Sequence, residues 1–290
     1  MTQQFPRFIG REEELDIVKE MLDEQGTLRI LSVHGDGGIG KTRLLEEIRE
    51  RFRADERLLI LDIIDFSETS CQTAEGVGRR LAKLLGEEHF REYLDALEER
   101  TEKVKQELAT WEELSKHVNE ALILCYNRLA VQRRIVLLFD TFEAVQYTDA
   151  GRILRELVEY LVNSVIIAAG RKNNELKDIM ERRLGDRIKF ITLDPFELDE
   201  TNRYFDETDI GRAIEPEMRE RVQILTNGHP ILIALAIEWL GREMPIPQLI
   251  ERSPAELLAL DEQTRARLQE ELQEALVSRD FAVFSWLRTS

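Results

Sequence analysis

Cysteine, histidine, proline and glycine are all scarce in this chain of 290 residues. Its two cysteines, Cys71 and Cys125, are too few for a disulfide framework or a structural zinc site, and its four histidines lack the spacing of metal ligands. We expect both cysteines to be small apolar side chains of the core. Only 15 glycines and 7 prolines accompany 43% hydrophobic and 33% charged residues, which excludes collagen-like and disordered chains. The sequence therefore predicts a globular protein with one large domain or two smaller ones.

Long hydrophobic runs are also missing. The longest apolar stretch, residues 231–240, is about half a bilayer span and contains Glu238, and the N-terminus shows no signal-peptide pattern. We therefore expect a cytoplasmic protein that does not enter a membrane. The net charge of −17 makes the average surface repel phosphate backbones and anionic lipids. Nucleic acid is accordingly not an expected partner unless the chain carries a local basic patch.

Five short runs of β-branched residues or leucine alternate with segments of helical spacing. The runs cover residues 28–34, 58–66, 134–140, 164–170 and 188–193. Near-continuous apolar residues are typical of strands buried on both faces, and the alternation predicts an α/β fold with a parallel five-stranded sheet and helices on both faces. After Pro195 the strand patterns stop, and short helices broken by glycine and proline follow. We expect two domains, an α/β domain at 1–195 and an all-helical lid subdomain at 196–290.

Residues 67–133 have helical spacing throughout. Phe90, Tyr93, Leu94 and Leu97 form one apolar stripe. The segment Thr110-Trp111-Glu112-Glu113 matches a capping box, which predicts a helix beginning at Trp111. A second box at Ser253-Pro254-Ala255-Glu256 and an amphipathic pattern over 261–287 predict further helices near the C-terminus.

One octet carries most of the functional signal, because it follows a predicted strand and precedes an amphipathic helix. It reads Gly35-Asp36-Gly37-Gly38-Ile39-Gly40-Lys41-Thr42, which satisfies the phosphate-binding pattern G-x-x-x-x-G-K-[ST]. Glycines let the backbone N–H groups turn inward around a phosphate, and the helix N-terminus adds partial positive charge. Lys41 can reach the β and γ phosphates, and the Thr42 hydroxyl can ligate Mg²⁺. The octet predicts a site for ATP or ADP with Mg²⁺.

Three further charged residues are expected beside this loop. Asp140 ends the apolar run 134–140, and the carboxyl ends of parallel strands meet in one crevice, so Asp140 is a candidate second metal ligand. Glu143 could polarise the attacking water, although many related ATPases place that acid directly after the aspartate, where this chain has Thr141. Arg171 ends the fourth run and could sense the γ-phosphate. Alternative readings are a turn residue for Asp140, a helix-start acid for Glu143 and a surface arginine for Arg171.

The chain resembles the nucleotide-binding core of the STAND class of P-loop ATPases, AAA+-related signalling switches that include the NB-ARC and NACHT groups. The resemblance spans residues 8–240 and rests on an ordered set of motifs. They are Phe8-Ile9-Gly10-Arg11-Glu12-Glu13-Glu14-Leu15, Gly40-Lys41-Thr42-Arg43-Leu44-Leu45, Asp140-Thr141-Phe142-Glu143, Ala169-Gly170-Arg171 and Gly228-His229-Pro230.

The resemblance implies roles for residues outside the octet. Phe8, Ile9 and Arg11 would form part of the adenine side of the pocket, Arg43 would extend the phosphate loop, and Pro230 would close over adenine or ribose from the lid. It also implies an ATP- and ADP-binding switch that regulates signalling or the assembly of a larger complex, with protein partners or self-assembly. No arginine is clearly placed to act as a finger in cis, so we expect slow hydrolysis.

Three other functions stay open at this point. One is a DNA-loading ATPase like the origin-recognition AAA+ proteins, which the net charge of −17 disfavours. Another is a scaffold that holds ADP without hydrolysing ATP, which Thr141 in the usual position of the acid favours. The last is a small-molecule kinase.

Overall fold

The computed structural model describes residues 7–24, 26–106, 111–172, 174–241, 253–267 and 269–270. Their contacts divide the chain into two compact units. The α/β unit comprises Arg11–Asp36 and Lys41–Leu193, and the helical unit comprises the N-terminal residues up to Gly10, Gly37–Gly40 and the chain from Asp194 onward. The two-domain division at residue 195 remains a prediction from the sequence.

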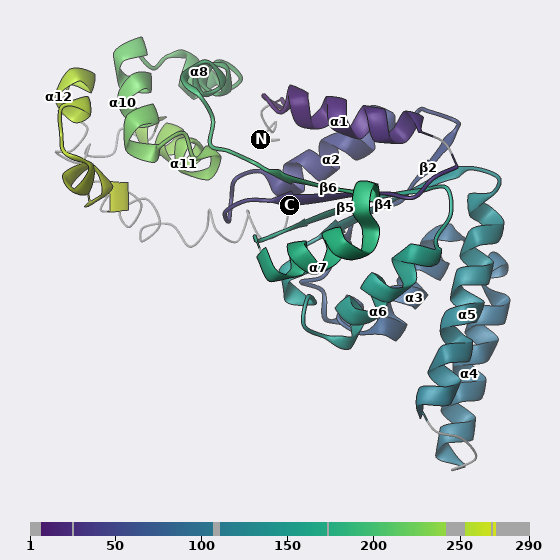
Figure 1. Ribbon diagram of the computed structural model, residues 1–290. Helices are drawn as coiled ribbons and strands as arrows, with labels where there is room; N and C mark the ends of the chain where they lie inside the picture. Colours follow the sequence, from purple (N-terminus) through teal and green to yellow (C-terminus); the bar gives the residue numbers. More distant parts are fainter. Residues whose placement is uncertain are drawn as a thin grey trace. The chain divides into compact units, whose positions relative to one another are not determined.

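A parallel sheet with the strand order β2-β4-β5-β1-β6 forms the centre of the α/β unit (Figure 1). The short strand β3 also pairs with β4, in parallel, next to β2 along the chain. The strands are β1 (Arg29–His34), β2 (Leu58–Ile60), β3 (Ile64–Asp65), β4 (Arg134–Asp140), β5 (Ser164–Gly170) and β6 (Ile188–Thr192). The predicted α/β fold with a parallel sheet is therefore confirmed.

The sheet has six strands, one more than predicted, because the run 58–66 is divided. Leu61 N–H still donates to Val136 O and Phe66 N–H donates to Asp140 O, so both ends of the run follow β4. Between them the exposed Asp62 side chain forms an ion pair with Arg49 on a helix. The chain leaves the ladder there, which separates β2 from β3.

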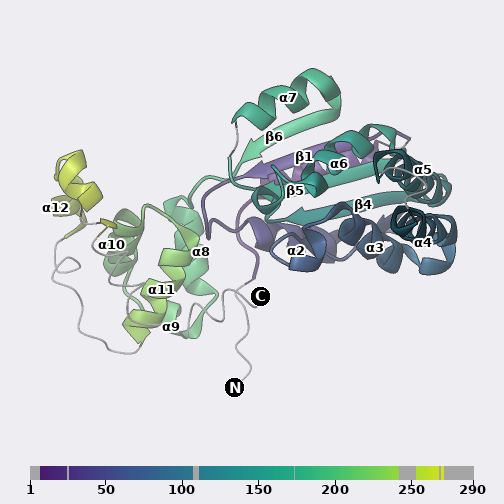
Figure 2. The same ribbon diagram turned by 90° about the horizontal axis from the view of Figure 1, so that it is seen from below.

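Helices cover both faces of this sheet. Figure 1 shows α1 and α2 on one face and α3, α6 and α7 on the other, and Figure 2 shows α6 over the strands and α7 beside β6. A hairpin of two longer helices, α4 and α5, packs side by side in both views. The helices are α1 (Glu12–Asp23), α2 (Lys41–Phe52), α3 (Ala74–Leu85), α4 (Arg91–Lys105), α5 (Trp111–Ala130), α6 (Asp149–Leu157) and α7 (Asn174–Leu184).

The core of the α/β unit is built on β4, whose seven residues are all buried. Phe139 of β4 stacks on Phe66 with ring centroids 5.4 Å apart. Cys71 and Cys125 are buried and free, which confirms that they serve as apolar core residues. A continuous apolar strand between two helical layers thus positions Asp140 at its carboxyl end.

The predicted apolar stripe of α4 is confirmed, since Phe90, Tyr93 and Leu97 are buried in the same core. Helix α5 covers Trp111–Ala130. Thr110, the first residue of the proposed capping box, lies outside the described residues, so the box and the helix start at Trp111 stay predictions.

The helical unit has its own small core, formed by Phe196, Phe205, Val222, Ile233, Ala236 and Ile237. Its helices are α8 (Leu198–Asp206), α9 (Asp209–Arg212), α10 (Pro216–Thr226), α11 (Pro230–Gly241) and α12 (Pro254–Leu258). The predicted box at α12 is confirmed, because the Ser253 hydroxyl accepts from Glu256 N–H and the Glu256 carboxylate accepts from Ser253 N–H. Most of the helix predicted over 261–287 lies outside the described residues. None of the helices in the described part of the chain has the length and apolar composition needed to cross a membrane.

Candidate functional site

The octet forms the connection between β1 and α2. Strand β1 ends at His34, and helix α2 begins at Lys41. Gly38 has φ 81° and Gly40 has φ 102°, values that a residue with a Cβ adopts only with strain. Gly38 and Gly40 are therefore required by the backbone path of this turn.

Lys41 lies across the start of the loop. Its ammonium group donates hydrogen bonds to the carbonyl oxygens of Gly35 and Asp36, both at 2.8 Å. Burial lowers the pKa of Lys41, although the carboxylates of Glu143 and Asp140 counteract the effect. The charged ammonium is thus partly desolvated and has only neutral carbonyl groups as hydrogen-bond acceptors in these two contacts, which favours an anion beside it.

Asp140 and Thr42 are in direct contact. The Thr42 hydroxyl donates to Asp140 Oδ2 at 2.6 Å, and the backbone N–H of Thr141 donates to Asp140 Oδ1 at 2.8 Å. Asp140 is only 6% exposed, and burial raises the pKa of its carboxyl group despite these two hydrogen bonds. The sequence correctly predicted that these two candidate metal ligands would meet.

The two side chains fit a magnesium ion. A hydroxyl and a carboxylate oxygen are hard ligands, and Mg²⁺ typically binds one or two protein ligands together with water and phosphate oxygens. The donor set therefore suits a metal that arrives with a phosphorylated ligand.

Sequence reasoning missed a second carboxylate near Asp140. Asp65 ends β3 and lies opposite Asp140 in the register of the sheet, and its charge contributes to the raised pKa of Asp140. Its oxygens accept hydrogen bonds from the backbone N–H and the hydroxyl of Ser67. An acid at the carboxyl end of a predicted strand is the signal that could have identified it.

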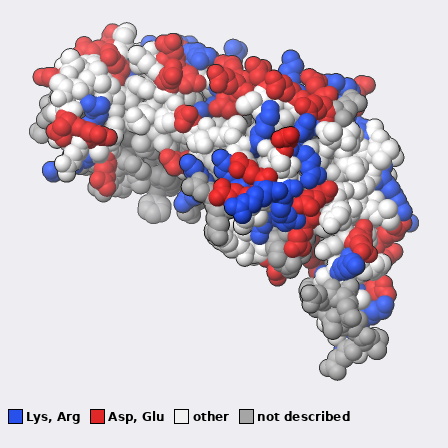
Figure 3. All heavy atoms as spheres, viewed as in Figure 1, with Lys and Arg blue, Asp and Glu red and all other residues white. Residues whose placement is uncertain are grey.

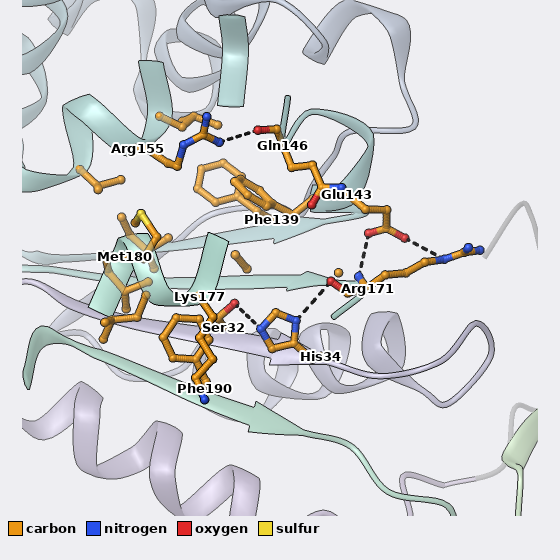
Figure 4. A pocket seen from close by; sticks show the side chains of 18 residues that line it. Ser32, His34, Phe139, Glu143, Gln146, Arg155, Arg171, Lys177, Met180 and Phe190 are labelled. Carbon is orange, nitrogen blue, oxygen red and sulfur yellow. Dashed lines mark hydrogen bonds and ion pairs between the residues drawn. The ribbon is translucent and has the colours of Figure 1, made fainter. Parts of the chain in front are cut away.

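Glu143 reaches the end of β5 because of an unusual turn after Asp140. Thr141 adopts the left-handed conformation with φ 55° and begins the 3₁₀ turn Phe142–Ala144. Glu143 Oε2 then accepts a hydrogen bond from Arg171 N–H at 3.2 Å, and Glu143 Oε1 lies 3.5 Å from Arg171 Nε (Figure 4). Glu143, two positions after Thr141, thus lies near Lys41, where its negative charge raises the pKa of the Lys41 ammonium group.

His34 is a further residue of the site that the sequence analysis did not single out. Its Nδ1 lies 3.3 Å from the carbonyl oxygen of Arg171, its Nε2 lies 3.1 Å from Ser32 Oγ, and its ring stacks on Phe190 at 5.8 Å (Figure 4). Burial lowers the pKa of His34, and three nearby lysines act in the same direction, whereas the contact with the Arg171 backbone opposes them. His34 therefore connects the end of β1 to the end of β5. Its position directly before Gly35 was the available signal.

The structure brings seven of the predicted residues together at the carboxyl end of the sheet in the α/β unit. They are Gly35, Asp36, Lys41, Thr42, Asp140, Glu143 and Arg171.

The remaining predicted residues are placed differently. Arg11 is the left-handed N-cap of α1 and forms an ion pair with Glu14, and Arg43 forms an ion pair with Glu46 along α2. Phe8, Ile9, Gly37, Gly38, Ile39, Gly40 and Pro230 belong to the helical unit. The nucleotide contacts proposed for all of these residues stay predictions.

Three solved structures with similar folds illustrate the architecture. Cdc6p from Pyrobaculum aerophilum matches with a TM-score of 0.52 and 15% identity over 83% of this chain and 63% of that protein. A Drosophila ORC bound to DNA matches with a TM-score of 0.52 and 14% identity over 94% of this chain and 68% of that chain. The Aeropyrum pernix ORC1 protein in complex with DNA matches with a TM-score of 0.53 and 13% identity over 88% and 66%. At these identities the matches show the fold alone, and the chain spans less than two thirds of Cdc6p.

Sequence comparison gives the family. No curated protein matches the chain significantly. A profile of the AAA ATPase domain, however, matches residues 7–167, which is more than half of the chain and includes the octet and Asp140. The chain therefore belongs to the AAA ATPase domain family, a family of nucleotide-binding ATPases.

Proposed function

We propose that this protein is an ATP- and ADP-binding switch that hydrolyses ATP slowly with Mg²⁺. One observation carries the proposal. The Lys41 ammonium group at the start of the octet and the Asp140 carboxylate in contact with Thr42 lie together at the carboxyl end of the sheet. Burial disfavours the charge of each, since it lowers the pKa of Lys41 and raises the pKa of Asp140. A phosphate beside Lys41 and a metal ion beside Asp140 would each stabilise the disfavoured charge.

Each residue of the site has a separate role in this proposal. Mg²⁺ held by Thr42 and Asp140 would neutralise charge on the terminal phosphates of the nucleotide. Lys41 binds the same phosphates, and Glu143 orients and deprotonates the attacking water. Glu143 accepts a hydrogen bond from Arg171 N–H and lies 3.5 Å from the Arg171 side chain, so its carboxylate interacts with this arginine in the absence of nucleotide.

This pairing supplies a way to distinguish ATP from ADP. Only ATP has a γ-phosphate, which competes with Glu143 for the guanidinium group of Arg171 through charge-assisted hydrogen bonds. A ligand shifts a conformational equilibrium only through its different affinity for the two states, and a change from 1:99 to 99:1 requires about 10⁴-fold. The contacts of Lys41 and Arg171 with a γ-phosphate are of the kind that supply such a difference.

Slow hydrolysis follows from the same pair. Because Arg171 is paired with Glu143, it is not available to stabilise the transition state. An arginine finger in that role is worth about 10³ to 10⁵ in rate. A second copy of the chain or another protein would bring such an arginine in trans. This fits a STAND-type switch in signalling or assembly, with adenine bound near Phe8, Ile9 and Arg11 and covered by Pro230.

A second candidate function is binding of duplex DNA, as in the origin-recognition proteins whose structures were solved with DNA. Figure 3 shows Lys and Arg side chains gathered over α7, where Arg182 and Arg183 are exposed. Arg187 comes directly before β6, and Lys189 lies within it. However, Arg183 forms an ion pair with Glu159 and Lys189 lies 3.8 Å from Glu20, so the patch is partly neutralised. Filter binding to duplex DNA at moderate salt tests this alternative.

Substitution of Lys41→Met tests the main proposal. Loss of the ammonium group removes charge-assisted hydrogen bonds worth roughly 1.5–3 kcal/mol each, so we expect ATP affinity to fall by about tenfold to more than a hundredfold. The control is Lys19→Met, which removes an exposed lysine of α1. Binding is measured by calorimetry, and folding by circular dichroism.

If the folded Lys41→Met variant bound ATP with wild-type affinity, the loop would not be the nucleotide-binding site. Steady-state phosphate release by the wild-type chain separates a slow ATPase from a scaffold that holds ADP, because the scaffold releases none.

A further inference from the structure

A cavity lies inside the α/β unit, between the sheet and helices α6 and α7. Its volume is about 70 Å³, and Figure 4 shows the side chains that surround it. Ser32 of β1 and Ala168 of β5 face it and are only partly buried, although both strands are in the interior of the sheet. The space is therefore a gap in the packing on the face of the sheet that α6 and α7 cover.

Most of the cavity wall is apolar. Buried side chains come from β4, β5 and β6 and from α6, α7 and the turn after α6; they are Phe139, Leu154, Val158, Ile166, Met180 and Ile188. An apolar wall of this kind favours a hydrocarbon group over water, because the water would lack hydrogen-bond partners there.

One end of the cavity is polar and carries positive charge. His34, Lys177 and the Glu143–Arg171 pair lie there, and Arg155 lies at the edge, where it donates a hydrogen bond to Gln146 O (Figure 4). The charged residues that line the cavity are thus three cations and one carboxylate, which lies beside Arg171, while Lys177 also pairs with Glu181 outside the lining.

Lys177 is the cation best placed to meet a ligand. Its ammonium group lies 5.4 Å from the centroid of the Phe190 ring, which also lines the cavity. Its ion pair with Glu181 is long, at 3.6 Å, and exposed, so it is easily exchanged for a contact with another carboxylate.

From these features we propose that the cavity is a binding site for a small molecule with a carboxylate head and a short aliphatic tail. The head would lie at the polar end, near Lys177 and His34, and the tail among the apolar side chains. A cavity of about 150 Å³ accepts benzene. A volume of about half that size fits a tail of three or four carbons.

Butyrate is the probe for this site, titrated into the full chain without nucleotide and followed by NMR chemical shifts. Butan-1-ol and butylammonium have the same number of carbon atoms as butyrate, with a neutral and a cationic head. We expect butyrate to bind more tightly than the alcohol and butylammonium not to bind. Because nucleotide is absent, the result does not depend on the proposed ATPase function.

Two variants and one control locate the binding. Lys177→Met removes the cation and should weaken butyrate binding by about tenfold, the value of one charge-assisted hydrogen bond. Lys19→Met is the control, since Lys19 is an exposed lysine of α1 that does not line the cavity, and it should leave binding unchanged. Ala168→Leu fills the cavity and should abolish binding.

Circular dichroism checks that each variant is folded. If Ala168→Leu fails to fold, Lys177→Met still decides, because Lys177 is partly exposed and its removal leaves the core intact. The proposal is overturned if butyrate does not bind, if butylammonium binds equally well, or if Lys177→Met and Lys19→Met have the same effect.

Discussion

Replacement of Asp140 by asparagine separates the charge of this residue from its hydrogen bonds. The side-chain oxygen of asparagine can still accept from Thr141 N–H, and the amide can donate to the Thr42 hydroxyl in place of the bond seen in the wild type. Because burial raises the pKa of Asp140, its ionised form destabilises the fold without ligand. We therefore expect the Asp140→Asn variant without nucleotide to unfold at a higher temperature than the wild type at neutral pH.

The difference in stability between the variant and the wild type should change with pH in one direction. A carboxyl group whose pKa is raised on folding contributes stability that is complete below its unfolded pKa of about 3.8 and is lost as pH rises through the folded pKa. The difference in melting temperature between the variant and the wild type should therefore increase from about pH 4 toward neutral pH. The exposed Asp62 supplies the control, as Asp62→Asn should not show this trend.

Addition of Mg²⁺ and ADP should reverse the order. At about one hundred times Kd, a ligand stabilises the native state by about 2.7 kcal/mol, which corresponds to roughly 5–11 °C. Asp140 is the one full negative charge of the proposed metal pair, and a tenfold loss of affinity reduces the stabilisation to about 1.4 kcal/mol. The ligand-induced shift of the variant should thus be smaller by roughly 3–5 °C.

Differential scanning fluorimetry with and without Mg²⁺ measures both effects. The reasoning is refuted if Asp140→Asn lowers stability in the absence of ligand, or if Mg²⁺ and ADP stabilise the variant as much as the wild type.

Two further substitutions test the turn after β4. Glu143→Gln keeps the contact with Arg171 N–H but removes the base, so phosphate release should fall by about 10² to 10⁴-fold while ATP affinity is retained; unchanged turnover would exclude Glu143 as the base. Thr141→Asn places a residue that tolerates the left-handed conformation at φ 55° and should stabilise the protein by about 0.5–1 kcal/mol in urea unfolding. A loss of stability in the second variant would mean that the threonine side chain outweighs its backbone strain.

Those parts of the fold that depend on local sequence were predictable. Continuous apolar residues define β4 and β5, and their bounds agree with the prediction because a strand covered on both faces tolerates no polar residue inside it. The loop before α2 was predictable for a similar reason, since Gly38 and Gly40 adopt positive φ values that other residues avoid.

Contacts that depend on the tertiary structure were not predictable. Thr141 is a β-branched residue, so sequence preference argues against the left-handed turn that brings Glu143 to Arg171. The division of β2 from β3 occurs at the exposed Asp62, which pairs with Arg49, and the role of His34 depends on the neighbouring strand. In each case the partner is distant in sequence, and no local pattern identifies it.

The peptide groups on either side of Arg171 are held from two directions. Its N–H donates to Glu143, and its carbonyl oxygen contacts His34, which also borders the cavity beneath. Because Arg171 and His34 both line the cavity, a displacement of this backbone changes part of the cavity wall. By thermodynamic reciprocity, a carboxylate that changes the affinity for ATP by some factor would have its own affinity changed by the same factor. Through His34 the proposed nucleotide site and the proposed carboxylate site share one backbone segment, so we expect binding at the two sites to be coupled.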